Sequence, residues 1–189
     1  MIRYWGYPVE EHYVVTEDGY ILCLHRIPYG RNNETESSGP RQPVFLGHAL
    51  IADSSEWVFG PPKKSLGYLL ADNNFDVWMG NTRGNTYSRN HISLNTCSYC
   101  PEFWSFGFDD SGEKDYSRTI DYILEITGQE KVHFVGHSMG TTQMMVRFLE
   151  ININNNVQCP RPQFLREINF RSYCQNVQST MTKFMVLTS

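Results

Sequence analysis

One pentapeptide constrains the fold of this chain more than any other part of its sequence. Residues 136–140 read Gly-His-Ser-Met-Gly, after a predicted buried strand at 131–135 and before a predicted helix at 141–150. A Gly-x-Ser-x-Gly pattern at a strand-to-helix junction makes a sharp turn that exposes the serine hydroxyl at the end of a sheet. Both glycines are needed because a side chain at either position would strike the neighbouring strand or helix.

The serine of this turn, Ser138, has two interpretations. It could simply cap the helix that follows, as serine often does. The strand before it and the amphipathic helix after it favour a catalytic nucleophile instead. A helix beginning at Met139 would direct its N–H groups and the positive end of its dipole toward a developing oxyanion. We therefore expect Ser138 to be a nucleophile and the Met139 N–H to be an oxyanion donor.

Hydrophobic residues elsewhere follow the periods of strands and helices. A β-hairpin is expected from Val9–Val15 and Ile21–Arg26, joined by a Glu-Asp-Gly turn. Short apolar runs predict buried strands at 44–46, 75–79 and 131–135. Helices are expected at 65–70, 110–127 and 141–150, the second because its apolar residues recur at helical spacing. This alternation predicts an α/β fold with a mostly parallel sheet flanked by helices.

The composition fits one globular domain or a piece of a larger one. The chain has 189 residues, 40% of them hydrophobic and 14% aromatic, which is too apolar for a disordered chain. A net charge of −4 argues against nucleic acid as a partner. No apolar run approaches the roughly 20 residues that span a bilayer. The N-terminus lacks the pattern of a secretory signal peptide, and Asn33-Glu34-Thr35 is a glycosylation sequon.

The composition changes near residue 150. All 14 glycines precede this point, and residues 1–150 are acidic whereas residues 151–189 are basic. We expect residues 1–150 to be the N-terminal part of the folded domain and residues 151–189 to be a divergent, irregular tail. The strand at 131–135 would then be an open edge, prone to aggregation, unless the tail covers it.

The five cysteines are too few for a disulfide scaffold, and an odd number cannot all pair within one chain. Cys97 and Cys100 have the spacing of a redox pair or of half a zinc site, but no second pair accompanies them. The favoured interpretation is a surface loop without a chemical role. Cys159 and Cys174 could be partners in the tail. No metal and no organic cofactor are expected.

The sequence also resembles a known family. It is similar to the animal acid lipases, which include gastric lipase and lysosomal acid lipase, over about residues 2–148. The matching stretches are Tyr4–Glu11, Val15–Leu22, Arg26–Gly30, Asp76–Asn81, Arg83–Thr86, Glu102–Trp104 and Gly136–Ser138. The resemblance implies an α/β-hydrolase fold, truncated here after the Ser138 turn. It also implies hydrolysis of triacylglycerols or cholesteryl esters through an acyl-enzyme, a neutral lipid ester at a lipid–water interface as partner, and secretion or lysosomal residence.

A second oxyanion donor is expected from the segment after the strand at 44–46. In α/β-hydrolases a His-Gly type sequence there supplies the other N–H, which points to Leu50. The acid lipases usually have glycine where this chain has Ala49 and glutamine where it has Met139. If position 49 requires a positive φ, alanine would cost about 1 kcal/mol there and tilt the Leu50 N–H.

Two groups of residues near these segments each have two possible roles. Asn81, Arg83 and Asn85 follow the strand at 75–79, and packing or salt bridging is favoured for Arg83 over a role in organising loops. Four aromatic residues could line an acyl pocket, although filling the core is the default for aromatic side chains. They are Trp78, Phe103, Trp104 and Phe106.

The largest departure from the family is the rest of the catalytic triad. In α/β-hydrolases the acid and the histidine follow the serine in the chain, but no Asp and no His follows Ser138 here, and all six histidines precede it. Without a general base a serine hydroxyl is a poor nucleophile near neutral pH. The alternative hypothesis is therefore a catalytically inactive, truncated lipase-like isoform or gene-model fragment, which at most binds lipid or a partner.

Overall fold

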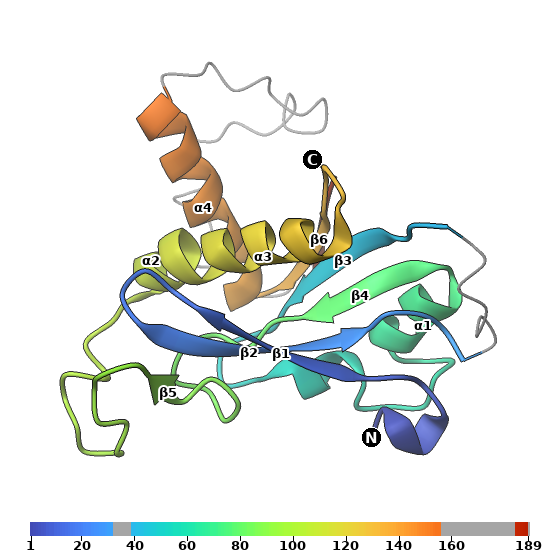
Figure 1. Cartoon of the computed structure of the whole chain (residues 1–189), viewed down its shortest axis with the longest axis horizontal. Helices are drawn as coiled ribbons and strands as arrows, with labels where there is room; N and C mark the ends of the chain where they lie inside the picture. Colours follow the sequence, from blue (N-terminus) through green and yellow to red (C-terminus); the bar gives the residue numbers. More distant parts are fainter. Residues whose placement is uncertain (32–38, 156–183, 189) are drawn as a thin grey trace.

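The computed structural model describes residues 1–31, 39–155 and 184–188. These residues form one open, twisted sheet with helices on both faces (Figure 1). The strands are β1 (Glu10–Val15), β2 (Tyr20–Ile27), β3 (Gln42–Gly47), β4 (Phe75–Met79), β5 (Asn90–His91), β6 (His133–His137) and β7 (Phe184–Thr188). Their order across the sheet is β1-β2-β4-β3-β6-β7, and β5 pairs with β2.

The helices differ in length and type. The α-helices are α1 (Leu66–Asp72), α2 (Phe108–Asp110), α3 (Ser117–Thr127) and α4 (Met139–Asn155), and two 3-10 turns are η1 (Arg3–Trp5) and η3 (Ser54–Trp57). The helix expected at 110–127 begins earlier, with α2, and passes through a π-helical segment, η4 (Ser111–Tyr116), before it continues as α3. No described helix is long and apolar enough to cross a membrane.

The centre of the sheet is parallel and its edges are antiparallel. β3 pairs in parallel with β4 on one side and with β6 on the other. The expected hairpin is confirmed, since β1 and β2 pair antiparallel from Glu10↔Arg26 to Val15↔Ile21. β2 also pairs antiparallel with β4, so the sheet is mixed, with its parallel part confined to β4, β3 and β6.

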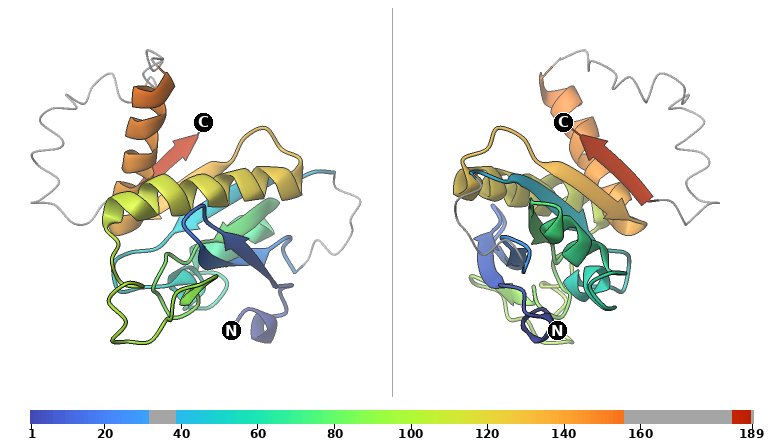
Figure 2. Two further views of the ribbon diagram at one scale, coloured as in Figure 1. Left: turned by 60° about the vertical axis from the view of Figure 1, so that its left-hand side comes forward. Right: turned by 90° about the vertical axis from the view of Figure 1, so that its right-hand side faces the viewer.

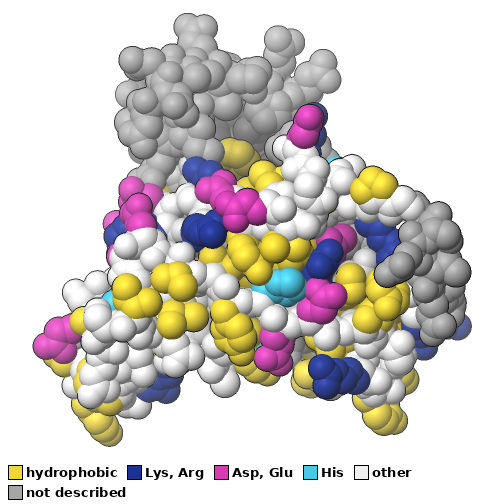
Figure 3. Space-filling model, in the orientation of Figure 1, with side chains coloured by type: hydrophobic (Ala, Val, Ile, Leu, Met, Phe, Trp, Pro, Cys, Tyr) yellow, Lys and Arg dark blue, Asp and Glu magenta, His cyan; other side chains and the backbone are white. Residues whose placement is uncertain are grey.

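Two cores lie on opposite faces of the sheet because successive strand residues face opposite sides. One core takes Phe45, Trp78 and Phe134 from the strands and is covered by residues of η4, α3 and α4. The other takes Val44, Leu46, Val77, Met79 and Val135 and is covered by residues of η3 and α1. Figure 2 shows α3 and α1 on the two sides of the sheet. In Figure 3 the apolar side chains that reach the surface form separate groups among charged ones.

The edge of β6 is covered by the C-terminal strand. β7 pairs with it antiparallel, from His133↔Thr188 to His137↔Phe184, so the tail does supply the cover that the exposed edge requires. Helix α4 also continues past residue 150, to Asn155. Most of 151–189, including Cys159 and Cys174, lies outside the described residues, as does Asn33. The division of the chain at residue 150 therefore stays a prediction.

Candidate active site

Ser138 lies on the sharp turn that its sequence predicts. It separates the end of β6 from the start of α4 and has a φ of 50°. A positive φ is uncommon for a residue with a side chain and costs on the order of 1–3 kcal/mol. The helix starts at once, because the Thr141 and Thr142 N–H groups both donate to the Ser138 carbonyl oxygen, at 3.0 and 3.3 Å.

The two glycines of the pentapeptide are required by close packing. A Cβ on Gly136 would lie 2.8 Å from the Thr141 nitrogen. A Cβ on Gly140 would overlap the backbone of Gly47, at the end of β3. The predicted reason for both glycines is thus confirmed: the turn is so tight that β6, α4 and the loop after β3 leave no room for a side chain.

The loop after β3 is joined to the start of α4. The Gly140 N–H donates to the His48 carbonyl oxygen at 3.1 Å. Leu50 and Met139, whose N–H groups are the expected oxyanion donors, both line one cavity of about 510 Å³. Ser138 is not part of that lining but directly precedes Met139. The structure therefore brings together the segments of all three site residues expected from the sequence.

The cavity has an apolar wall. Trp104, Phe106 and Phe108 line it together with Leu50 and Ile51. Trp78 and Phe103 instead are fully buried in the core around Phe45. The four aromatic residues considered for an acyl pocket are therefore divided, with Trp104 and Phe106 in the cavity and the other two in the protein interior.

Ala49 does not incur the strain considered for it. The described non-glycine residues with positive φ are Ile51, Asn74 and Ser138, so position 49 has no need of glycine. The strained residue of this loop is Ile51, with a φ of 61° and a side chain that is 98% exposed. For a β-branched residue such a φ is a true outlier.

His48 is a buried structural residue at the base of this loop. Its Nε2 accepts a hydrogen bond from the Thr82 N–H at 3.2 Å, so its proton is on Nδ1, which donates to the Ala49 carbonyl oxygen at 2.8 Å. Burial lowers the pKa of His48, which favours this neutral form. Both nitrogens are thus engaged in holding the loop, and His48 is not free to serve as a general base.

Glu56, on η3, is a site residue that the sequence did not indicate. Its Oε2 accepts from the Ala49 N–H at 2.9 Å, and its Oε1 is hydrogen-bonded to His137 Nδ1. Nothing in the sequence pattern singles it out, because the contact with His137 joins residues 81 positions apart.

Arg83 is confirmed as a salt-bridging residue. Its side chain is buried and pairs with Asp115 at 2.7 Å and with Asp18 at 2.7 Å, while its guanidinium lies 4.1 Å from the Tyr20 ring centroid. Although burial raises the pKa of Asp18, hydrogen bonds from Arg83 and Thr16 and the Arg83 charge lower it to about 2. The network joins the hairpin turn to η4, and Arg83 itself lines the cavity.

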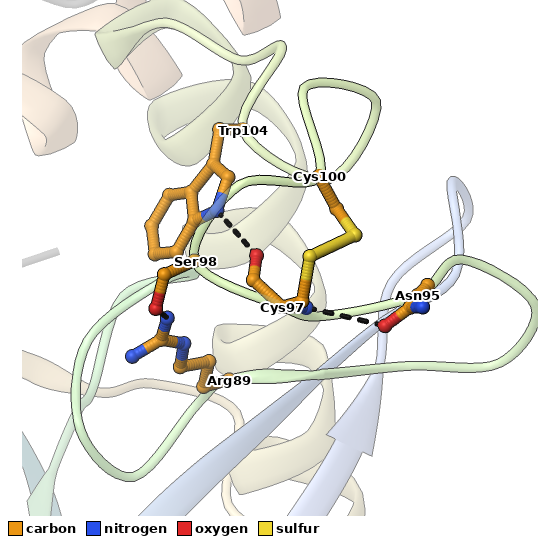
Figure 4. Close-up of a disulfide and its surroundings, with 6 residues drawn as sticks. All are labelled: Arg89, Asn95, Cys97, Ser98, Cys100 and Trp104. Carbon is orange, nitrogen blue, oxygen red and sulfur yellow. Dashed lines mark hydrogen bonds between the residues drawn. A yellow bond between two sulfur atoms is a disulfide. The ribbon is translucent and has the colours of Figure 1, made fainter.

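The loop that supports Trp104 contains a disulfide. Cys97 and Cys100 are bonded, which corrects the interpretation of this pair as part of a plain surface loop (Figure 4). Trp104 Nε1 donates to the Cys97 carbonyl oxygen at 3.0 Å, and the Arg89 guanidinium lies 5.0 Å from the Trp104 ring centroid. The sequence could have suggested this bond from the two-residue spacing alone, but not its contact with a cavity residue.

Two family models match the sequence. A "partial alpha/beta-hydrolase lipase region" matches residues 1–60, and the "alpha/beta hydrolase fold" matches residues 42–159. Human lysosomal acid lipase/cholesteryl ester hydrolase is 53% identical over 151 residues, which are 80% of this chain and 37% of that protein. Bovine gastric triacylglycerol lipase is 52% identical over 148 residues, 78% of this chain and 36% of that protein. The chain thus spans just over a third of the length of these relatives.

Solved structures share the fold at low sequence identity. The esterase Pf2001 of Pyrococcus furiosus matches with a TM-score of 0.53 and 14% identity, over 76% of this chain and 47% of its own. DcsB, in complex with its substrate analogue, matches with a TM-score of 0.54 and 14% identity, over 91% of this chain and 53% of its own. These likenesses concern the fold alone. The resemblance to acid lipases rests on the sequence matches.

Proposed function

Because this chain belongs to the α/β-hydrolase fold family, we propose that it carries the nucleophile half of a lipase active site. The observation that carries the proposal is the positive φ of Ser138 between β6 and α4, beside the cavity that Leu50 and Met139 line. The substrate class follows from relatives named as triacylglycerol lipase and cholesteryl ester hydrolase. Their lysosomal and gastric names support secretion or lysosomal residence.

The proposed reaction is acyl transfer through a serine ester. The Ser138 oxygen attacks the ester carbonyl carbon, and the Leu50 and Met139 N–H groups donate to the resulting oxyanion. The carbonyl re-forms as the departing alkoxide takes up the proton that Ser138 gave up. Water then adds to the serine ester, which releases the fatty acid and returns a proton to the Ser138 oxygen. The dipole of α4 favours the negative charge at the same place.

The cavity wall suits the acyl part of such a substrate. Trp104, Phe106 and Phe108 offer an apolar surface beside the proposed oxyanion donors. A neutral lipid ester has long hydrocarbon chains that gain by leaving water, on the order of 0.8 kcal/mol for each buried methylene. The substrate is expected to approach at a lipid–water interface, near the exposed side chains of Leu50 and Ile51.

The proton of Ser138 must pass to a base in the first step, and we assign no described residue to this role. His48 is engaged through both nitrogens, and no Asp or His follows Ser138 in the sequence. The second candidate, carried over from the sequence, is a lipase-like chain without turnover that binds lipid or a partner.

Covalent labelling with a fluorophosphonate distinguishes the two candidates. The probe reacts with activated serines and mimics the tetrahedral intermediate. Stoichiometric labelling of the wild-type chain that Ser138→Ala abolishes is the result expected for the lipase. Ser93→Ala is the control, because this exposed serine is distant in sequence from the turn and should leave labelling unchanged. Absence of labelling in folded protein, checked by circular dichroism, would favour the non-catalytic candidate.

A further inference from the structure

The carboxylate of Glu56 connects the two segments that form the proposed oxyanion site. We propose that Glu56 is a positioning residue, which holds the loop of residues 48–51 against the Ser138 turn so that the Leu50 and Met139 N–H groups converge. This inference rests on the proposed function, because it assigns a purpose to the convergence of those two N–H groups.

The two oxygens of Glu56 have separate partners. Oε2 accepts the Ala49 N–H at 2.9 Å, and Oε1 binds His137 Nδ1. Ala49 directly precedes Leu50, and His137 directly precedes Ser138. One side chain therefore contacts the neighbour of an oxyanion donor and the neighbour of the nucleophile. Hydrogen bonds to an ionised carboxylate are about twice as strong as neutral ones.

The backbone beneath Glu56 is well fixed. η3 begins after Asp53, whose carboxylate accepts the Ser55 N–H at 2.8 Å, and the Glu56 N–H donates to the Asp53 carbonyl oxygen at 3.0 Å. Trp57, the next residue, is buried in the core between η3 and the sheet. The carboxylate is thus presented from a capped turn with a buried anchor, which suits a residue that fixes the position of others.

The loop that Glu56 contacts needs such support. Its outer residues contribute little packing, since Leu50 is 55% exposed and Ile51 is 98% exposed, and Ile51 has the strained φ of 61°. Strained backbone persists only where its surroundings determine it. The buried ring of His48 holds one end of the loop and Glu56 holds the adjoining Ala49 amide. An oxyanion donor must lie within about 2.7–3.1 Å of the oxygen it stabilises, so small shifts matter.

The test compares Glu56→Ala and Glu56→Gln with the control Glu130→Ala, at an exposed glutamate just before β6. Two quantities are measured: the rate constant for fluorophosphonate labelling of Ser138, and hydrogen exchange of the Ala49 and Leu50 amides. Glu56→Ala should label about 100-fold more slowly, comparable to losing one oxyanion donor, and both amides should exchange faster. Glu56→Gln keeps an acceptor for the Ala49 N–H. This variant should therefore recover part of the labelling rate and part of the protection of the amides against exchange. The control should behave as wild type.

The two readouts separate this inference from the proposed function. If wild-type protein is not labelled, the proposed function fails, and amide exchange alone decides the role of Glu56. Unchanged exchange at Ala49 and Leu50 in Glu56→Ala overturns the inference in every case, and so does wild-type labelling of that variant. Circular dichroism melting monitors folding. If Glu56→Ala does not fold, Glu56→Gln is judged by the same two measurements, and wild-type values for both overturn the inference.

Discussion

The two walls of the cavity are held in place by different means. The wall formed by the Ser138 turn, which carries Met139, is fixed by backbone: close approach at Gly140, the positive φ of Ser138 and the Gly140 N–H hydrogen bond to the His48 carbonyl oxygen. A second wall, with Arg83 and Trp104, is fixed by side chains, through the ion pairs of Arg83 and the contact of the Arg89 guanidinium with the Trp104 ring. Backbone restraint suits the proposed chemistry, where donor positions must be exact to fractions of an ångström, whereas the proposed acyl-binding wall depends on side-chain contacts.

The largest effect is expected from breaking the ion network of the side-chain wall. Arg83→Leu leaves the Asp115 carboxylate buried without its partner, because Asp115 accepts the Arg83 Nε and Nη2 hydrogens. The loss should be about 3–5 kcal/mol of unfolding free energy, measured by urea titration. Arg118→Leu removes an exposed pair with Glu125 and should cost at most about 1 kcal/mol. Equal losses in the two variants would contradict a buried network.

A smaller loss of stability is expected from disturbing the backbone wall. Gly140→Ala places a methyl group against the carbonyl of Gly47, which belongs to the central strand and has little freedom to move. Overpacking of this kind costs about 1–3 kcal/mol, and labelling of Ser138 should fall as well. The matched change Gly60→Ala meets only the Ser65 Oγ, at 3.1 Å, and should be tolerated. Unaltered labelling of Gly140→Ala would show that the turn accommodates a side chain.

Trp104→Ala should distinguish acyl binding by the side-chain wall from the reactivity of Ser138 on the backbone wall. It removes an apolar surface of the cavity but leaves the Ser138 turn intact. Labelling by a long-chain alkyl phosphonate should fall about tenfold, the scale of a lost hydrophobic contact, whereas a short-chain probe should react as with wild type. Tyr99→Ala, at a 94% exposed residue in the neighbouring loop, is the control. If both probes lose reactivity equally, the acyl role of Trp104 is wrong.

The smallest expected effect is a pH dependence of stability from the buried His48 and the partly buried His25. Burial lowers the pKa of His48, despite the nearby acids Glu56 and Asp53, and also lowers that of His25. The unfolded imidazoles, with pKa near 6.5, bind protons that the folded ones do not. The contribution of these histidines to the free energy of unfolding is therefore fully present above about pH 6.5. It should decrease as the pH falls below this value. Urea unfolding between pH 7.5 and 5 checks this, and constant or rising stability on acidification would refute it.

Much of the fold was accessible from local patterns. The hairpin, the three central strands and the two helices α1 and α4 follow from hydrophobic period and turn residues, and all of them are present. The π-helical segment at Ser111–Tyr116 was missed because such single turns are rare and because the apolar residues that predicted the helix begin only at its last residue, Tyr116. The sequence indicated that the edge of β6 needs a cover, but it did not predict that β7 pairs with this edge. Strand partners are set by contacts between residues that are distant in sequence.

By itself, the sequence determined the Ser138 turn and the glycines around it, because a strand, a tight turn and a helix that follow one another in the chain are encoded by neighbouring residues. Tertiary structure alone decided that Glu56 contacts both Ala49 and His137, that Arg83 pairs with Asp18 and Asp115, and that Trp104 rather than Trp78 borders the cavity. The reason is physical: these contacts join side chains from separate elements, and only the packing of the sheet against its helices sets which of them meet.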